Sequence, residues 1–271
     1  MAIKLIAIDM DGTLLNPKNE ITARVQAVIQ KASSVGITII LATGRPFIGV
    51  QRYLKELGLQ KDNQCCITHN GALIQRATDG ECVSELLLNF NDYLYFEQLA
   101  RVLGVHFQAL TKTEMFTSNQ DISEYTVHEA WMTGIPLRYR CVSDMDCNLF
   151  FPKVMMLDPP ELLDQAISHM PYVALQKYSI MKSSPYYLEI LDKRANKGTR
   201  VKFIAEKLGL KRHEVMAIGD QENDLSMLEY AGISIAMGNS ISSVKKIAQF
   251  ITHTNAEDGV ALAIESFVQL S

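Results

Sequence analysis

The stretch that decides the fold is "AIKLIAIDMDGTLLN" (Ala2–Asn16), in which an apolar run ends on two aspartates, Asp9 and Asp11, separated by one residue. The run Ile3–Ile8 has no polar alternation apart from Lys4, and such a run predicts a fully buried β-strand. Buried strands of this kind are typical of parallel sheets whose two faces are both covered. The sequence therefore poses the question of why a buried strand ends in two acidic side chains.

The composition indicates a globular protein with a small ligand. The chain has 271 residues and 48% hydrophobic content, which is enough for one large domain or two. Its 26 basic and 30 acidic residues give a formal charge of −4, and no long run carries one sign. This balance argues against nucleic acid or a membrane surface as the main partner. The oligomeric state stays open, with a homodimer among the options.

The chain carries no pattern of a membrane or secreted protein. No apolar stretch approaches 18 residues, and the N-terminal run is too short for a signal peptide and is interrupted by Asp9. The five cysteines are odd in number and form no CxxC pair, so a disulfide framework or zinc site is not expected. We therefore expect a cytoplasmic protein with reduced thiols.

The first third of the chain alternates between apolar runs and amphipathic helical patterns. The runs Ile3–Ile8, Ile37–Thr43 and Cys65–Thr68 are predicted as strands of one sheet, and the alternation resumes in the last third around Val215–Gly219. Strands that alternate with helices form parallel sheets whose ligands bind at the carboxyl ends of the strands. The sequence thus predicts an α/β fold with a doubly wound, Rossmann-like parallel sheet.

The middle of the chain has a different character. Eight of the ten tyrosines and the single tryptophan, Trp131, lie between about Ser84 and Glu189, where the strands are joined by shorter loops. This shift predicts an inserted α+β domain. We expect the first part of the core at 1–83, the insertion at 84–189 and the second part of the core at 190–271.

Polar side chains follow three of the buried strands. They are Asp9 and Asp11 after the first strand, Thr43 after the second, and Asp220 after Val215–Gly219. Asn223 and Asp224 come three and four residues after Asp220, on one face of the first turn of the next predicted helix. Because the carboxyl ends of parallel strands lie at one edge of the sheet, these groups form a predicted carboxylate cluster.

Four converging carboxylates repel one another, so they are either partly protonated or bound to a cation. Their hard oxygen ligands favour Mg²⁺. A cation is available from Lys197 in "RANKGT", and a hydroxyl is available from Thr43. The backbone N–H groups of "TGR" add hydrogen-bond donors. Together they predict a cradle for a phosphate group.

The spacing of the first two aspartates fits a division of labour. Asp9, at the strand end, is placed to bind the metal and to attack phosphorus, and Asp11 is placed to reach the leaving oxygen. Gly12 allows the tight turn that follows, and Thr13 is expected to satisfy backbone groups there.

Each feature has an ordinary structural explanation when it is taken alone. Two aspartates after a strand often cap a helix or close a turn, Thr43 is a plausible helix cap before Pro46, and a single lysine is usually solvated. The order of the four features along the chain, each at a joint between strand and helix, favours the catalytic explanation. Calcium loops are excluded, because their required glycine is missing at Leu225 and misplaced in "DMDGT". The six histidines form no metal-binding pair, although His69 follows a strand end.

The stretches "DMDGTLLN", "LATGRP", "NKG" and "GDQENDLSML" resemble the four motifs of the haloacid dehalogenase-like hydrolase superfamily. Since the insertion lies between the second and third of these stretches, the chain is similar to the Cof-type phosphatases, a subgroup that includes bacterial sugar phosphatases. The resemblance covers nearly the whole chain and implies a core with an inserted α+β cap domain.

The resemblance also implies roles for individual residues. It makes Asp9 the nucleophile and Asp11 the general acid and base. It assigns Mg²⁺ to the side chains of Asp9 and Asp220 and to the backbone carbonyl of Asp11, with support from Asp224. It assigns the phosphate oxygens to Thr43, Lys197, Asn223 and the N–H groups of Met10 and Gly44. The stretch "THNGA" (Thr68–Ala72) resembles a further Cof-type segment, which implies that Asn70 and Gly71 lie near the substrate.

The expected activity is hydrolysis of sugar phosphates and other small phosphorylated metabolites through an aspartyl-phosphate. A sugar phosphomutase or phosphotransferase uses the same motifs and is one rival; a receiver-like phosphorylation switch is another, disfavoured by the second aspartate and the large insertion. The aromatic residues of the cap are expected to form its own core more than to stack on sugars.

Overall fold

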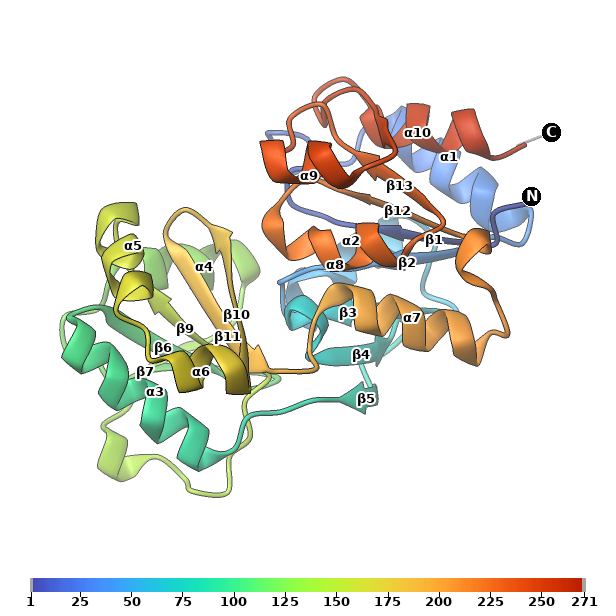
Figure 1. Ribbon diagram of the computed structural model, residues 1–271. Helices are drawn as coiled ribbons and strands as arrows, with labels where there is room; N and C mark the ends of the chain where they lie inside the picture. Colours follow the sequence, from blue (N-terminus) through green and yellow to red (C-terminus); the bar gives the residue numbers. More distant parts are fainter. Residues whose placement is uncertain (1, 270–271) are drawn as a thin grey trace. The chain divides into compact units, whose positions relative to one another are not determined.

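The computed structural model describes residues 2–269, and the chain forms two compact units (Figure 1). The first unit takes in Met1–Gly44, Gln51–Val83 and Asn196–Ser271, and the second takes in Arg45–Val50 and Ser84–Ala195. The second unit thus continues past Glu189, the expected end of the insertion. It does so because the strand that contains Glu189 runs on to Asp192.

The first unit is built on a five-stranded parallel sheet with the order β14-β13-β12-β1-β2. Its strands are β1 (Leu5–Ile8), β2 (Thr38–Leu41), β12 (Val215–Gly219), β13 (Ile233–Ala236) and β14 (Phe250–Ile251). In β1, Ile8 lies opposite Leu41 on one side and Ile218 on the other, so three strands end at the same level. This register brings the residues that follow β1, β2 and β12 to one edge of the sheet.

Helices cover both faces of this sheet. They are α1 (Ala23–Ser34), α2 (Gln51–Glu56), α7 (Lys197–Lys207), α8 (Leu225–Tyr230), α9 (Ser242–Ile247) and α10 (Gly259–Phe267), with 3₁₀ turns η2 (His69–Gly71), η4 (Arg212–Glu214) and η5 (Glu222–Asp224). Leu5 and Ala7 pack in one cluster with residues of α7 and α8, while Ile6 and Ile8, which point to the opposite face, are also fully buried. In Figure 1, α1 and α10 lie side by side. The doubly wound α/β prediction is confirmed.

The strand Cys65–Thr68 belongs to a different sheet from the one expected. It forms β3, which pairs antiparallel with β4 (Leu73–Arg76) in a three-stranded sheet completed by β5 (Cys82–Glu85). The chain reverses directly after β3 through the η2 turn, which commits the strand to a hairpin. A single bridge between Ala42 and Ile67 connects it to the end of β2.

The second unit is an α+β domain around a six-stranded sheet with the order β10-β11-β9-β6-β7-β8. All its neighbouring strands are antiparallel except the parallel pair of β7 and β8. Its strands are β6 (His106–Leu110), β7 (Met115–Thr117), β8 (Leu137–Tyr139), β9 (Lys153–Leu157), β10 (Tyr178–Ser184) and β11 (Tyr187–Asp192); its helices are α3 (Phe90–Leu103), α4 (Glu124–Thr133), α5 (Pro160–Ser168) and α6 (Tyr172–Lys177), with 3₁₀ turns η1 (Phe47–Gly49) and η3 (Val142–Asp144). The expected inserted α+β domain is therefore present. Within residues 2–269, no helix has the length and apolar character needed to cross a membrane.

Many aromatic residues of the second unit form its own core. Tyr93 stacks on Phe151 with a centroid distance of 5.2 Å, and Phe96 meets Tyr178 edge-on at 4.7 Å. All four side chains are at most 5% exposed. Trp131, at 79% exposed, is an exception.

A buried lysine lies between two buried glutamates in the second unit. Lys153 Nζ lies 3.1 Å from Glu189 Oε1 and 3.2 Å from Glu129 Oε1, and all three side chains are at most 4% exposed. Gln108 Nε2 and Ser183 Oγ donate further hydrogen bonds of 2.6 Å to Glu129 and Glu189 respectively. Charges this deeply buried are tolerated only when they are paired and hydrogen-bonded.

We predict that Lys153→Met destabilises the second unit by about 3–5 kcal/mol, because it leaves two buried carboxylates without their cation. Lys182→Met is the matched control: Lys182 pairs with the largely exposed Asp164, and its loss is expected to cost less than about 1 kcal/mol. Urea unfolding followed by near-ultraviolet circular dichroism measures both effects in this unit, because eight of the ten tyrosines of the chain lie in it. Equal losses for the two variants would contradict the prediction.

Candidate active site

The ends of β1 and β12 bring three carboxylates together. Asp9 follows β1 and Asp220 follows β12, and the Asp9 backbone N–H donates to Ile218 across the two strands at 3.0 Å. Oxygens of Asp9, Asp220 and Asp224 all lie within 4.8 Å of one another, and each residue is at most 4% exposed. The predicted carboxylate cluster therefore exists in the structure, with Asp11 outside this buried set and exposed.

Lys197, the first residue of α7, places its ammonium group between two of these carboxylates. Its Nζ donates to Asp9 Oδ1 at 2.5 Å and to Asp224 Oδ1 at 2.7 Å, and the side chain is 0% exposed. Burial lowers the pKa of Lys197, but the carboxylates of Asp224 and Asp9 raise this pKa by more than burial lowers it. The pKa of Lys197 therefore lies above its ordinary value. The lysine is a permanent cation inside the cluster.

Asp224 is fixed on all sides by hydrogen bonds. Its Oδ2 accepts from the backbone N–H groups of Asp220 at 2.8 Å and Gln221 at 3.0 Å, while its Oδ1 accepts from Lys197. It lies in the η5 turn ahead of α8, not in the first turn of an α-helix as the spacing predicted. Because both oxygens are engaged, Asp224 is suited to orienting Lys197 and the Asp220 backbone.

The loop after β1 is tied to the end of β12. Gly12 has a φ of +82°, and a Cβ there would lie 2.4 Å from Asp220 Oδ2, so no larger residue fits. Thr13 Oγ1 donates to Asp220 Oδ1 at 2.8 Å. The expected partners of this hydroxyl were backbone groups, but its partner in the structure is the carboxylate of Asp220.

Two asparagines that the sequence analysis missed hold the same loop from the C-terminal part of the chain. Asn239 Nδ2 donates to the Gly12 carbonyl at 2.8 Å, and Asn255 Nδ2 donates to the Leu15 carbonyl at 2.7 Å. The Asn255 N–H also donates to Asn239 Oδ1 at 3.0 Å. Isolated asparagines in loops carry no pattern that would have revealed these bonds.

The cluster has the chemistry of a divalent-cation site. Burial, followed by the charge of Asp224, raises the pKa of Asp9 well above its ordinary range and that of Asp220 to about 7. Three carboxylates around one lysine leave excess negative charge that a cation would offset. Asp9 and Asp220 would hold such an ion, with Asp224 beside them, since both oxygens of Asp224 already accept hydrogen bonds. Carboxylate oxygens suit a hard divalent cation.

The residues expected to bind phosphate lie at the same edge of the sheet. Thr43 is fully buried beyond β2, and its N–H donates to the Ile67 carbonyl at 2.9 Å. Its carbonyl accepts from the Asn70 N–H at 2.9 Å, and Asn70 Oδ1 accepts from Asn223 Nδ2 at 3.0 Å. Asn70 thus connects the "TGR" stretch to the "GDQENDLSML" stretch.

Two further backbone groups were expected at the phosphate. Gly44 follows Thr43 directly, and a Cβ on it would lie 2.9 Å from Asn70 Nδ2. Met10 is fully buried between the two aspartates, and its carbonyl accepts from the N–H groups of Thr13 and Leu15. The structure therefore places Met10 within the same loop as Asp9 and Asp11.

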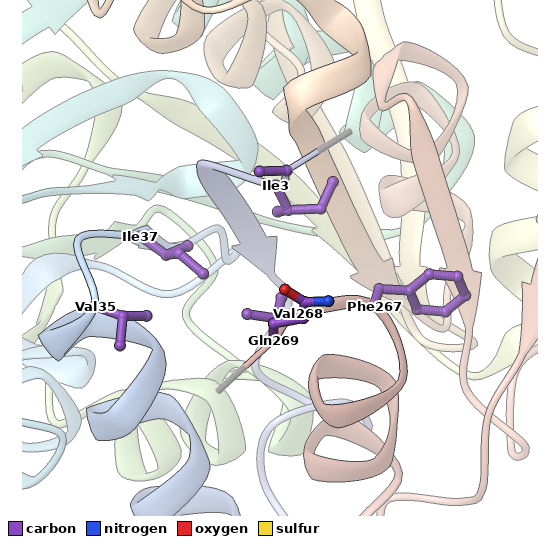
Figure 2. A pocket seen from close by; sticks show the side chains of 7 residues that line it. Ile3, Val35, Ile37, Phe267, Val268 and Gln269 are labelled. Carbon is purple, nitrogen blue, oxygen red and sulfur yellow. The ribbon is translucent and has the colours of Figure 1, made fainter. Parts of the chain in front are cut away.

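A crevice of about 470 Å³ elsewhere in the first unit does not suit an anionic substrate (Figure 2). It lies where the chain enters β1 and β2, at the end of the strands opposite to Asp9 and Thr43. Its lining residues are Ala2, Ile3, Val35, Ile37, Phe267, Val268 and Gln269. None of these lining residues carries a charge, so none of them would offset the negative charge of a bound phosphate.

A family model of haloacid dehalogenase-like hydrolases matches residues 6–264. The chain belongs to this family. All four motif stretches and the insertion lie inside the matched range, so the family resemblance found in the sequence is confirmed.

Relatives of high similarity cover the chain from end to end. "Putative phosphatase M6_Spy0533" of Streptococcus pyogenes serotype M6 is 44% identical over 268 residues, which cover 99% of both chains. The "5-amino-6-(5-phospho-D-ribitylamino)uracil phosphatase YcsE" of Bacillus subtilis is 31% identical and covers 98% of this chain and 96% of its own. The crystal structure of a haloacid dehalogenase-like hydrolase from Bacteroides thetaiotaomicron superimposes with a TM-score of 0.85 at 32% identity, covering 97% and 99% of the two chains.

In the absence of a metal, the raised pKa of Asp220 predicts how the free energy of unfolding of this haloacid dehalogenase-like hydrolase depends on pH. Between the ordinary value of 3.8 and about 7, the folded chain keeps a proton that the unfolded chain has released. The free energy of unfolding therefore falls as the pH rises through this window in EDTA. Asp220→Asn removes that contribution, whereas Asp164→Asn, at an exposed position, keeps it.

The stabilisation by added Mg²⁺ should grow over the same pH window, because bound carboxylates must be deprotonated. Thermal unfolding at about pH 5 and about pH 8, with EDTA or Mg²⁺, measures it. The site assignment is wrong if Mg²⁺ raises the melting temperature equally at both pH values.

Proposed function

We propose that the protein is a magnesium-dependent phosphatase that hydrolyses sugar phosphates and other small phosphorylated metabolites through an aspartyl-phosphate on Asp9. The observation that carries the proposal is the buried Asp9 carboxylate, held at 2.5 Å by Lys197 beside Asp220 and Asp224. A carboxylate in this position is a nucleophile whose surroundings are arranged to accept a phosphate dianion.

The chain's own residues divide the work at the reacting phosphate. Lys197 holds one oxygen of Asp9 in place, so that the carboxylate is oriented before the substrate arrives. Thr43, Asn223 and the N–H groups of Met10 and Gly44 bind the phosphate oxygens. When bound, Mg²⁺ adds positive charge that offsets the repulsion between the phosphate and Asp9.

Asp11 supplies the proton chemistry in this proposal. It is exposed and lies outside the buried triad, two residues beyond the nucleophile, so its carboxyl group is placed on the solvent side, where a leaving group would meet it. It protonates the leaving alkoxide in the first step and accepts a proton from the attacking water in the second. The two aspartates are thereby separated by environment into a nucleophile and an acid.

The proposed substrate class is a phosphate monoester on a small polyhydroxylated molecule. The 31% identical relative from Bacillus subtilis is named for a phosphorylated ribitylamino compound, which supports this class. The direct test is a release assay for inorganic phosphate over a panel of sugar phosphates and polyol phosphates. Transfer of the phosphoryl group to a sugar, with no free phosphate, would contradict hydrolysis and favour a phosphotransferase.

We predict that Asp9→Asn lowers kcat at least about a hundredfold, because an amide does not attack phosphorus. Lys197 keeps Asp224 as a partner in this variant, so the fold is expected to remain intact. Asp62→Asn, at an exposed position of the same unit, is the matched control and should leave kcat unchanged. Residual turnover of Asp9→Asn above about one hundredth of the wild-type value would exclude the covalent mechanism.

The role of Asp11 predicts a dependence on the leaving group. Asp11→Asn should slow hydrolysis of glucose 6-phosphate at least about tenfold more than that of p-nitrophenyl phosphate, whose leaving group needs no proton. Steady-state kinetics on both substrates measure the two ratios. Equal losses on both would show that Asp11 is not the general acid.

A further inference from the structure

The turn Thr68–Ala72 is strained where it meets the candidate phosphate site. His69, Asn70 and Gly71 have φ values of 49°, 51° and 99°, so three consecutive residues adopt the left-handed region. Runs of this kind are costly for residues other than glycine and persist where the surroundings fix them. The turn is also buried, with His69 and Asn70 at 0% exposed.

The turn is fixed from the side of α7. A Cβ on Gly71 would lie 2.5 Å from the carbonyl of Asn196, the residue that caps α7 ahead of Lys197. Arg200 of α7 donates from Nε to the Gly71 carbonyl at 2.6 Å and from an Nη to the Ala72 carbonyl at 3.1 Å. The helix that positions Lys197 therefore also positions Asn70.

Among residues 2–269, Asn70 is the one hydrogen-bond partner of the Asn223 side chain. Asn223 Nδ2 donates to Asn70 Oδ1 at 3.0 Å, and the buried Asn223 Oδ1 has no partner there. Without Asn70, the amide of Asn223 would be free to rotate. The Asn70 amide also lies beside Gly44, on the other side of the proposed phosphate cradle, since a Cβ on Gly44 would lie 2.9 Å from Asn70 Nδ2.

We infer that Asn70 is a positioning residue, which holds the Asn223 amide so that its second N–H is presented to a phosphate oxygen. This inference rests on the proposed function, because it adds a residue to the phosphate site proposed there. Asn70 acts through Asn223 and does not itself bind the reacting group. Its loss should therefore weaken binding of the phosphoryl group by the same factor for every substrate.

The test is a double-mutant cycle of Asn70→Gly and Asn223→Ala. Glycine keeps the left-handed backbone of residue 70 and removes only its side chain. Asn19→Gly is the matched control, since Asn19 has a φ of 59°, is exposed and lies outside the site. Each variant is measured for KM and kcat on glucose 6-phosphate and p-nitrophenyl phosphate, and for the inhibition constant of inorganic phosphate.

Asn70→Gly should raise KM and the phosphate inhibition constant about tenfold, equally on both substrates, while Asn19→Gly leaves them unchanged. In the Asn223→Ala background, Asn70→Gly should add less than about a twofold effect, because the proposed route through the Asn223 amide is already lost. A full additional loss in that background, or wild-type values for Asn70→Gly alone, would overturn the inference.

Binding of inorganic phosphate to the wild-type protein with Mg²⁺, read as protection against thermal unfolding, separates the two proposals. If the wild-type protein binds inorganic phosphate and has phosphatase activity, and Asn70→Gly behaves like it, the positioning role of Asn70 is contradicted while the proposed function stands. Wild-type protein that neither binds phosphate nor releases it contradicts the proposed function, and the inference with it.

Discussion

The buried ammonium of Lys197 is the constraint on which the rest of the site depends. A lysine that is 0% exposed is unstable as a cation unless carboxylates compensate for its lost hydration. Asp9 and Asp224 supply that compensation from segments far apart in the sequence. The same two bonds that make the buried charge tolerable fix the side chain of Asp9, so folding of the first unit also orients the proposed nucleophile.

The charges of the cluster explain why the site invites both a cation and a phosphate. The three carboxylates and the lysine carry a net charge of −2 when all are ionised. Burial, and after it the negative charge of Asp224, raises the pKa values of Asp9 and Asp220 in the absence of a metal. A divalent cation would bring the sum to zero, and a phosphate dianion would then meet far less repulsion at Asp9.

Part of this arrangement followed from the sequence because parallel strands end at one edge of a sheet. Asp9 and Asp220 were expected to meet for this reason, and the register of Ile8 opposite Ile218 brings them together. The strand Cys65–Thr68 was assigned to the wrong sheet, because periodicity does not distinguish a parallel strand from the first arm of a hairpin. The reversal depends on left-handed residues at His69 and Asn70, which are not glycines.

The hydrogen bonds and ion pairs between side chains far apart in the chain could not be predicted from the sequence. Asn70 with Asn223, Thr13 with Asp220, and Lys153 with its two glutamates all join residues whose separation in the chain carries no period. The paired residues lie on turns, loops, strands and, for Glu129, on a helix, and no regular spacing marks them. Only the fold determines which of many possible partners lies within hydrogen-bonding distance.

The central claim is that Asp9 forms a covalent bond to phosphorus, and the most direct measurement is mass spectrometry of the protein quenched with acid during turnover. The peptic peptide that contains Asp9 is prepared at acid pH, which preserves an acyl phosphate. With p-nitrophenyl phosphate the Asp11→Asn variant should accumulate the intermediate, because its formation needs no acid while its hydrolysis is slowed. The account predicts one added phosphoryl group on this peptide, localised to Asp9 and absent from Asp9→Asn. Steady turnover with this peptide unmodified throughout would contradict it.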